Sequence, residues 1–368
     1  MALSVRPVGP EQNEEMLRIL LDAPMESEGL TLVLDRTPDI FTVPRHFFEA
    51  YKAYGFYLDD DLVGFGMICE KELYVNGQPR KTGYFANLYV KREARKMGWL
   101  YRASAPFFDD ITQRVSIGYA TTVKGNRATE TMIGRRIPKF PLMPYTFSAG
   151  LHRTHNILIT FAKKQRSKLH IRRAGDADLH AIAALLDSEY CNRLFGPVYT
   201  PEKLEQTIRS RPGFSISDYW VAENGERMVG VCSAWDIGSF RRIRVLAYRK
   251  SYRIIYRLYR LLGPLLGFPA LPKPGEPFRE LVVNDFATEN RDPEILRALL
   301  VAVYGEARRR GYNMIQVGSY EGDPMLGAAR RFFCQPLISN VVVGTTTEDL
   351  TEKEGIDLMR PFVDIALT

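Results

Sequence analysis

Hydrophobic and polar positions follow the same order twice along this chain. The first round opens with a short strand pattern at residues 5–8 and continues with an acid-rich helical stretch at 11–21. The second round opens with a similar strand pattern at 171–174, and a helical run at 178–189 comes after it. The pattern therefore predicts two units that each begin with a strand and a helix.

A second match fixes the register between the two units. Asp61-Leu62-Val63-Gly64 parallels Arg227-Met228-Val229-Gly230, and 58 positions separate Val5 from Val63 as well as Ile171 from Val229. Both matches therefore share an offset of 166 residues. A constant offset indicates an internal repeat of one fold rather than two chance resemblances.

The later elements continue in the same order in both units. In the first unit we expect strands at 55–58, 62–71, 84–90 and 116–123, helices from about 99 and near 128–136, and last strands at 142–149 and 157–161. In the second unit the corresponding pieces are 281–287, 293–310, 314–319, 324–333 and 339–346. The second unit carries an insertion of about 30 residues, at about 243–277, because its fourth strand comes later than the offset requires.

Length and composition agree with two folded domains. The chain has 368 residues, of which 45% are hydrophobic and 25% are charged, and this excludes wholesale disorder, a collagen-like fibre and a disulfide scaffold. We place the domains at 1–162 and 163–368, with a basic linker at 163–173. No stretch of about 18 uncharged apolar residues predicts a membrane span, and the N-terminus lacks the apolar core of a signal peptide.

The cysteines and histidines do not predict a reactive or metal site. The four cysteines form no C-x-x-C pair and have apolar neighbours, so we expect buried free thiols and a reducing, cytoplasmic compartment. His152 and His155 have an H-x-x-H spacing without a nearby carboxylate or thiol, and we expect no metal there. The cysteines are Cys69, Cys191, Cys232 and Cys334.

The net charge of +7 is concentrated locally. Residues 241–260 contain eight Lys or Arg and no acid, and tyrosines recur there at helical spacing. A helix on an anionic membrane surface, a lid over the acceptor site, and a cradle for an acidic partner all fit this pattern. We favour a helix packed on its own domain with a solvated basic edge, and base stacking on RNA is the least supported interpretation. We expect no specific nucleic-acid partner.

The segment from Tyr84 to Tyr101 has the strongest chemical signal. An apolar strand runs into a short turn with Arg95, Lys96 and Gly98, and the turn opens a helix. A helix N-terminus offers unpaired N–H groups and a positive dipole end, while glycine lets a phosphate approach the backbone. This arrangement suits a pyrophosphate group.

The same segment resembles the acyl-CoA motif of the GNAT N-acyltransferase superfamily, Arg/Gln-x-x-Gly-x-Gly/Ala after the fourth strand. Arg95 and Gly98 match the first two fixed positions, and Leu100 departs from the third. The resemblance covers nearly the whole chain as two tandem copies. It implies an α/β (α+β) fold, in which each GNAT-like domain has a mixed, mostly antiparallel central sheet flanked by helices.

The resemblance also implies cofactor-binding residues. In the family, pantetheine lies between the splayed fourth and fifth strands, and a backbone N–H on the fourth strand polarises the thioester carbonyl. An Asn after the fifth strand is common, and a helix N-cap is an equally good interpretation of it here. The expected contacts are Leu88, Tyr89, Val90, Arg95, Lys96, Met97, Gly98, Trp99, Leu100 and Asn126.

The general acid of the family has no obvious counterpart. The position of the family's tyrosine falls at about Met132, which cannot donate a proton. Tyr119 and Tyr145 are the nearest candidates, and packing is the first interpretation of both. The second unit lacks a glycine in its turn and places Glu289 and Asp292 there, which would repel a pyrophosphate. We therefore expect acyl-CoA in the first unit alone.

The resulting hypothesis is an N-acyltransferase that uses acetyl-CoA or another acyl-CoA as co-substrate. It would transfer the acyl group directly to a small-molecule or peptide amine, and residues 22–46 would form one wall of the acceptor pocket. One alternative is a non-catalytic acyl-CoA-binding pseudoenzyme. The other is a membrane-peripheral acyltransferase that uses residues 241–260.

Overall fold

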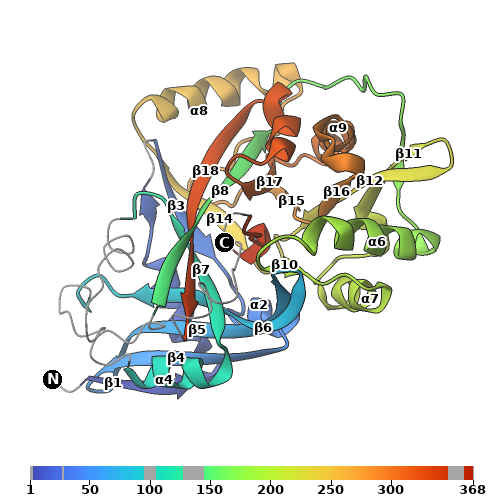
Figure 1. Cartoon of the computed structure of the whole chain (residues 1–368). Coiled ribbons are helices and arrows are strands. Elements are labelled where there is room, and N and C mark those ends of the chain that lie inside the picture. Colours follow the sequence, from blue (N-terminus) through green and yellow to red (C-terminus); the bar gives the residue numbers. More distant parts are fainter. Residues whose placement is uncertain (1–2, 27–28, 95–104, 127–144, 347–359, 368) are drawn as a thin grey trace.

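The computed structural model describes residues 3–26, 29–94, 105–126, 145–346 and 360–367 (Figure 1). The first half contains β1 (Leu3–Val8), α1 (Asn13–Leu21), β2 (Met25–Glu26), β3 (Leu30–Asp35), α2 (Thr42–Phe47), β4 (Ala50–Leu58), β5 (Asp61–Val75), β6 (Gln78–Val90), α4 (Ala105–Arg114), β7 (Ile117–Val123) and β8 (Tyr145–Leu158). The second half begins with β9 (His170–Arg173), α6 (Leu179–Tyr190), β10 (Gly196–Pro197), α7 (Pro201–Ser210), β11 (Tyr219–Asn224), β12 (Arg227–Ser233) and β13 (Trp235–Asp236). It continues with β14 (Arg242–Tyr248), α8 (Lys250–Leu262), β15 (Glu280–Val283), β16 (Phe286–Thr288), α9 (Pro293–Arg309), β17 (Met314–Tyr320) and β18 (Cys334–Thr345).

These strands form one large mixed sheet and two small ones. The large sheet has the order β1-β4-β5-β6-β7-β18-β8-β17-β15-β13, with β10 added on β5. A second sheet has the order β16-β12-β11-β9, and a third has β14-β3-β2. The predicted fold class, mixed sheets flanked by helices, is therefore confirmed.

The internal repeat has a direct structural counterpart. Gly64 of β5 is paired with Val90 of β6, and Gly230 of β12 is paired with Thr288 of β16. The two glycines are 166 residues apart, which is the offset that the sequence predicts (230 minus 64). Strands β5 and β12 are thus equivalent, and the same pairing aligns β6 with β16.

The last strand of each half pairs with the other half. Strand β8 is antiparallel to β17 and to β18, while β18 is also antiparallel to β7. The prediction of separate strands at 142–149 and 157–161 is wrong, because β8 is continuous through the polar residues between them. Strands on both sides bond its backbone there, and His152 and Thr154 are buried. The boundary between residues 162 and 163 stays a prediction.

The insertion is only partly helical. Residues 242–248 form β14, which pairs with β3, and the helix α8 begins at Lys250. The prediction of a helical period from residue 241 is therefore wrong over this segment. Arg242 and Arg244 place their guanidinium groups 3.1 and 2.6 Å from the buried Asp35 carboxylate, so part of the basic run is neutralised inside the protein.

Two large hydrophobic clusters hold the sheets and helices together. The larger one spans both halves, since it contains Phe65 and Tyr119 together with Tyr190 and Tyr219.

All four cysteines are free thiols, and Cys191 and Cys334 are half-buried rather than buried. Among the described residues, no helix is both long and apolar enough to cross a bilayer. Nor do the described residues gather three or more His, Cys, Asp or Glu side chains into a possible metal site.

Candidate active site

Strands β6 and β7 touch at one point and then separate. They are parallel, and their register contains only the pairs Gly83 with Gly118 and Tyr84 with Tyr119. Strand β6 nevertheless continues to Val90 and β7 to Val123. In the described part of the chain, no strand pairs with residues 85–90 on the β7 side, so the two strands diverge, and we name the region between their diverging arms the slot.

Glycines and aromatic rings form the vertex of this slot. A Cβ atom on Gly118 would lie 2.8 Å from the Gly83 carbonyl oxygen, so this approach needs a residue without a side chain. Next to the glycines, the rings of Tyr84 and Tyr119 lie 4.9 Å apart, and Phe195 stacks on Tyr119 at 4.3 Å. Backbone contact and ring packing together hold the strands at this point.

A β-bulge lies on the open arm of β6. Phe65 of β5 is opposite Tyr89 and Met67 is opposite Ala86, so two residues of β6 face one of β5. The bulged residue Asn87 has a φ of 55°, in the left-handed region that asparagine tolerates. The predicted contacts Leu88, Tyr89 and Val90 follow this bulge, and Leu88 is exposed.

Only some of the other predicted site residues lie within the part of the chain that the structure describes. The segment from Arg95 to Leu100 (Arg95, Lys96, Met97, Gly98, Trp99 and Leu100) and Met132 lie outside the described residues. Asn126 lies in a turn after β7, where its N–H donates to the Val123 carbonyl at 3.1 Å. Tyr145 begins β8 opposite Thr345, and its side chain is not among those described. These site predictions therefore stay predictions.

Tyr119 is both a packing residue and a cavity residue. It is buried between Tyr84 and Phe195, and burial raises the pKa of its hydroxyl well above the usual value. Its hydroxyl has no hydrogen-bond partner among the described residues, and Tyr119 lines a cavity of about 220 Å³. The hydroxyl therefore stays protonated next to an open space.

The two halves build this cavity together. Its wall contains residues 45–49 at the end of α2 and just after it, residues 71–73 of β5, four residues of α7, Asn284 and Asp285 before β16, and three residues of the C-terminal segment. Of the acceptor wall expected at 22–46, Arg45 and His46 line the cavity. We name it the Lys71–Asp364 cavity after the two groups that are available to a ligand.

One charged pair in the wall is already fully occupied. The Asp285 carboxylate accepts hydrogen bonds from the Arg211 guanidinium, from Tyr199 at 2.7 Å and from Tyr219 at 2.9 Å. Burial alone would raise the pKa of Asp285, but Arg211 and these hydroxyls more than offset it and lower the pKa. These groups form a rigid part of the cavity wall, because their hydrogen-bonding capacity is used within the cluster.

Lys71 and Asp364 differ from that pair. The Lys71 ammonium has no ion pair or hydrogen bond within the described part of the chain. Burial lowers the pKa of this amine, Arg211 lowers it further, and the Asp364 carboxylate offsets the shift only in part. Among the described residues, the Asp364 carboxylate accepts one hydrogen bond, from the Ala366 N–H at 2.9 Å, and burial raises the pKa of this carboxyl. Perturbed groups without fixed partners beside a cavity are typical of functional sites.

The sequence analysis missed both residues. Lys71 ends the run Met67-Ile68-Cys69-Glu70-Lys71 inside a long strand, and Asp364 interrupts the apolar segment Phe362-Val363-Asp364-Ile365. A charged residue inside an apolar stretch was the available signal. No local pattern indicates that Asp364 of the C-terminal segment and Lys71 of β5 line one cavity.

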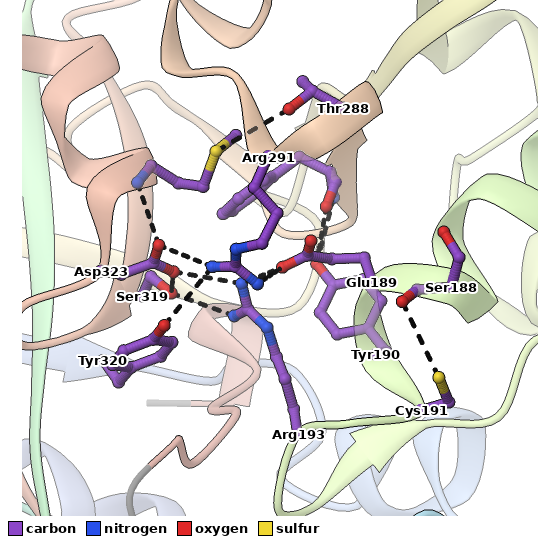
Figure 2. A network of polar contacts seen from close by, with 12 residues as sticks. Ser188, Glu189, Tyr190, Cys191, Arg193, Thr288, Arg291, Ser319, Tyr320 and Asp323 are labelled. Atoms are coloured by element: carbon purple, nitrogen blue, oxygen red, sulfur yellow. Dashed lines mark hydrogen bonds and ion pairs between the residues drawn. The ribbon is translucent and has the colours of Figure 1, made fainter.

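The equivalent slot of the second unit is filled by the protein's own side chains (Figure 2). Strand β15 pairs with β17 through Val283, after which β16 turns to β12. Between them, Arg193 and Arg291 lie 3.1 and 2.7 Å from the Asp323 carboxylate. Glu189 bonds both arginines, and its oxygen lies 2.6 Å from Arg291. Arg291 comes from the turn that corresponds to the predicted pyrophosphate loop of the first unit.

The backbone of this second slot is occupied as well. Because Val90 corresponds to Thr288, Leu88 corresponds to Phe286. The Phe286 N–H donates to the Tyr190 hydroxyl at 3.1 Å, and that hydroxyl in turn donates to the Asn284 carbonyl at 3.2 Å. The donor that Leu88 could offer to a ligand in the first unit therefore has an internal partner in the second.

Solved structures of similar fold match nearly the whole chain. A yeast (Saccharomyces cerevisiae) N-myristoyltransferase with bound myristoyl-CoA matches with a TM-score of 0.59 and 11% identity, over 94% of this chain and 79% of that one. This chain has the GNAT fold. A probable N-acyltransferase from Enterococcus faecalis matches with a TM-score of 0.52 and 12% identity, over 96% and 75% of the two chains. A GCN5-related N-acetyltransferase from Anabaena variabilis matches with a TM-score of 0.51 and 10% identity, over 94% and 73%.

The resemblance that the motif suggested is thus confirmed at the level of the GNAT fold. No family model matches the sequence, and no curated protein does either. At 10% to 12% identity, the three structures show the fold and not an activity.

Proposed function

We propose that this protein is an acyl-CoA-dependent N-acyltransferase that transfers an acyl group directly to an amine bound in the Lys71–Asp364 cavity. The divergence of β6 and β7 beyond Tyr84 and Tyr119 carries this proposal. A slot between two parallel strands, with backbone donors on its edge, suits an extended pantetheine chain. In the second unit the same slot is filled, so we infer that only the first unit takes acyl-CoA.

The donor would lie with its thioester near the vertex. The backbone N–H of Leu88 follows the bulge, where no described strand pairs with β6 on its β7 side. A fixed N–H aimed at the thioester carbonyl stabilises the negative charge that develops on that oxygen when an amine attacks. Residues 95–100 would hold the pyrophosphate from the C-terminal end of β6.

Asp364 is the proposed general base. An amine acceptor is a cation at neutral pH, and its nitrogen attacks only after it has lost a proton. The Asp364 carboxylate would take that proton, and its raised pKa brings it closer to the pH at which it operates. The amine nitrogen then bonds to the acyl carbon, the carbon–sulfur bond breaks, and the nitrogen releases its second proton to solvent as the amide forms.

Tyr119 is the proposed general acid. Tyr119 lines the cavity at the vertex, and its hydroxyl holds a proton because burial raises its pKa. It would donate its proton to the departing CoA thiolate, and solvent would restore it. This assignment fills the role for which Met132 is unsuited.

Lys71 suggests what kind of amine is bound. Its ammonium lies beside the cavity and forms no ion pair or hydrogen bond within the described residues, although the Asp364 carboxylate is near enough to raise its pKa. An acceptor with an amine near Asp364 and an acidic group near Lys71 would satisfy both charges. We therefore propose an amino acid, a peptide or a similar small molecule that carries both groups.

Binding of acetyl-CoA to the full chain, measured by titration calorimetry, tests the donor site. We expect one site per chain. Arg95→Ala together with Lys96→Ala should weaken binding, whereas Arg18→Ala together with Arg209→Ala, on exposed helix surfaces, should not. Absence of binding to any acyl-CoA from acetyl to myristoyl, in folded protein, would reject the proposal.

Release of free CoA thiol tests catalysis separately. A panel of amines with and without an acidic group is incubated with the preferred acyl-CoA, and thiol release is followed over time. We expect turnover with amines that carry an acidic group and a raised KM for them in Lys71→Met. Tight acyl-CoA binding without turnover on any amine would instead support the pseudoenzyme.

The four free cysteines lead us to place the enzyme in the reducing cytoplasm.

A further inference from the structure

Helix α8 presents a different character on each of three faces. Tyr252, Tyr256 and Tyr259 form the face that packs on the protein, where the Tyr256 ring stacks on Tyr248 at 4.1 Å. The tyrosine rings are thus engaged internally, which removes the base-stacking interpretation of this segment. The helix is attached to its own domain through this tyrosine face, as the packed-helix interpretation expects.

The second face is apolar and open to solvent. Ile254, Leu258 and Leu261 are spaced four and three residues apart, so they form one stripe along the helix. Their exposed fractions are 62%, 52% and 70%, and α8 has no buried residue. The stripe is extended by further exposed aliphatic residues around it and after the helix, namely Ile255, Leu262, Leu265 and Leu266.

An aromatic pair continues this apolar surface. Phe161 is 60% exposed, and its ring meets Phe268 edge to face at 4.8 Å. Phe268 in turn contacts Tyr259 of α8, with ring centroids 5.4 Å apart. Figure 1 shows α8 along the outer edge of the molecule, clear of the other helices. A packed helix with a solvated edge does not explain so large an exposed apolar surface.

The third face is basic and borders the apolar stripe. Lys250, Arg253, Arg257 and Arg260 are exposed, and none of them forms an ion pair with another described residue. The sequence from 241 to 275 contains no Asp or Glu. The basic face therefore complements an anionic surface, and the apolar stripe beside it complements an apolar layer beneath that surface.

We propose that α8 docks this protein on an anionic phospholipid bilayer, with its apolar stripe among the acyl chains and its basic face at the lipid phosphates. An amphipathic helix of 13 residues is long enough to lie in the interface. The tyrosine face stays on the protein, so docking requires no unfolding of the helix. This proposal does not depend on the acyltransferase activity.

Co-sedimentation of the full chain with vesicles tests the proposal. At low salt the protein should pellet with vesicles of phosphatidylcholine and phosphatidylserine in equal parts, and stay in solution with phosphatidylcholine alone. Binding should weaken as salt is added, because salt screens the lipid charge. A Trp placed at Leu261 should shift its emission to the blue on binding.

Variants separate the two faces of the helix. Leu258→Asp with Leu261→Asp should abolish pelleting, and Leu258→Ile with Leu261→Ile should retain it. Arg253→Gln with Arg257→Gln should lower partition roughly 30-fold, since each charge near an anionic surface contributes about a factor of five. Arg18→Gln with Arg209→Gln removes the same charge from exposed helices elsewhere and should change partition far less.

Two results would overturn the proposal. One is that the folded full chain stays in solution with the anionic vesicles at low salt. The other is that α8 joins two copies of the protein: sedimentation velocity would then detect a dimer that Leu258→Asp with Leu261→Asp dissociates, and no vesicle would bind. Circular dichroism and thermal unfolding of each variant verify that these exposed substitutions leave the fold intact.

Discussion

Single residues in this protein act through what surrounds them. Asp285 and Asp364 line the same cavity, yet the pKa of Asp285 is lowered and that of Asp364 is raised. The difference arises because Arg211, Tyr199 and Tyr219 all bond Asp285, whereas Asp364 has one backbone donor. Residue type alone does not distinguish a wall residue from a candidate base.

Activity should therefore depend on pH through Asp364. The base works only when it is deprotonated, so kcat/KM should rise with pH across a pKa above the usual carboxyl range. Asp364→Asn should lower kcat by roughly 10²- to 10⁴-fold and remove this limb of the profile. A pH profile of initial rates measures both effects, and an unchanged profile in the variant would mean that another group accepts the proton.

The stability should also depend on pH, through His152. Burial, reinforced by Arg193, lowers the pKa of this histidine from 6.5 to about 4. Below pH 6.5 the unfolded chain therefore binds a proton at His152, whereas the folded chain does not bind it until the pH is near 4. The free energy of unfolding falls as the pH is lowered from 6.5 to about 4. The loss should amount to about 3 kcal/mol. Denaturant unfolding of wild type and His152→Gln at several pH values should show a shallower decline in the variant.

At the scale of elements, close packing of two strands determines where the slot begins. The pair Gly83 and Gly118 allows β6 and β7 to meet, and the bulge at Asn87 keeps the rest of β6 away from β7. The sequence predicted both strands. It did not predict the bulge, because an extra residue in a strand is defined only against its partner.

Replacement of one vertex glycine tests this geometry. Gly118→Ala would place a methyl group 2.8 Å from the Gly83 carbonyl, so the strands must move apart. We expect a loss of about 1–3 kcal/mol in unfolding free energy and weaker acyl-CoA binding. Gly175→Ala is the matched control, because nothing lies within 4 Å of its added Cβ. Equal stability of the two variants would mean that the vertex is not tightly packed.

At the scale of the whole molecule, the two repeats are not independent. Strand β8 of the first half lies between β17 and β18, and β18 of the second half lies between β7 and β8. The Lys71–Asp364 cavity likewise takes its walls from both halves. The repeat in the sequence therefore marks two copies of a fold that complete each other's sheet.

Expression of the halves tests this exchange. Residues 1–162 alone should aggregate, because β8 would lack both of its neighbours and expose hydrogen-bonding groups on both edges. Co-expression with residues 163–368 should restore a stable complex that elutes as one species in size-exclusion chromatography. A monomeric, cooperatively folded first half would contradict the prediction.

The sequence by itself determined the repeat and most strands and helices, and it predicted a donor segment at residues 84–101. These features are local, since each depends on a periodicity, a glycine or a fixed spacing within one stretch of chain. Only the tertiary structure decided that β14 is a strand, that Lys71 and Asp364 share a cavity, and that one apolar face of α8 is exposed. These features depend on contacts between residues far apart in the chain, which no local pattern specifies.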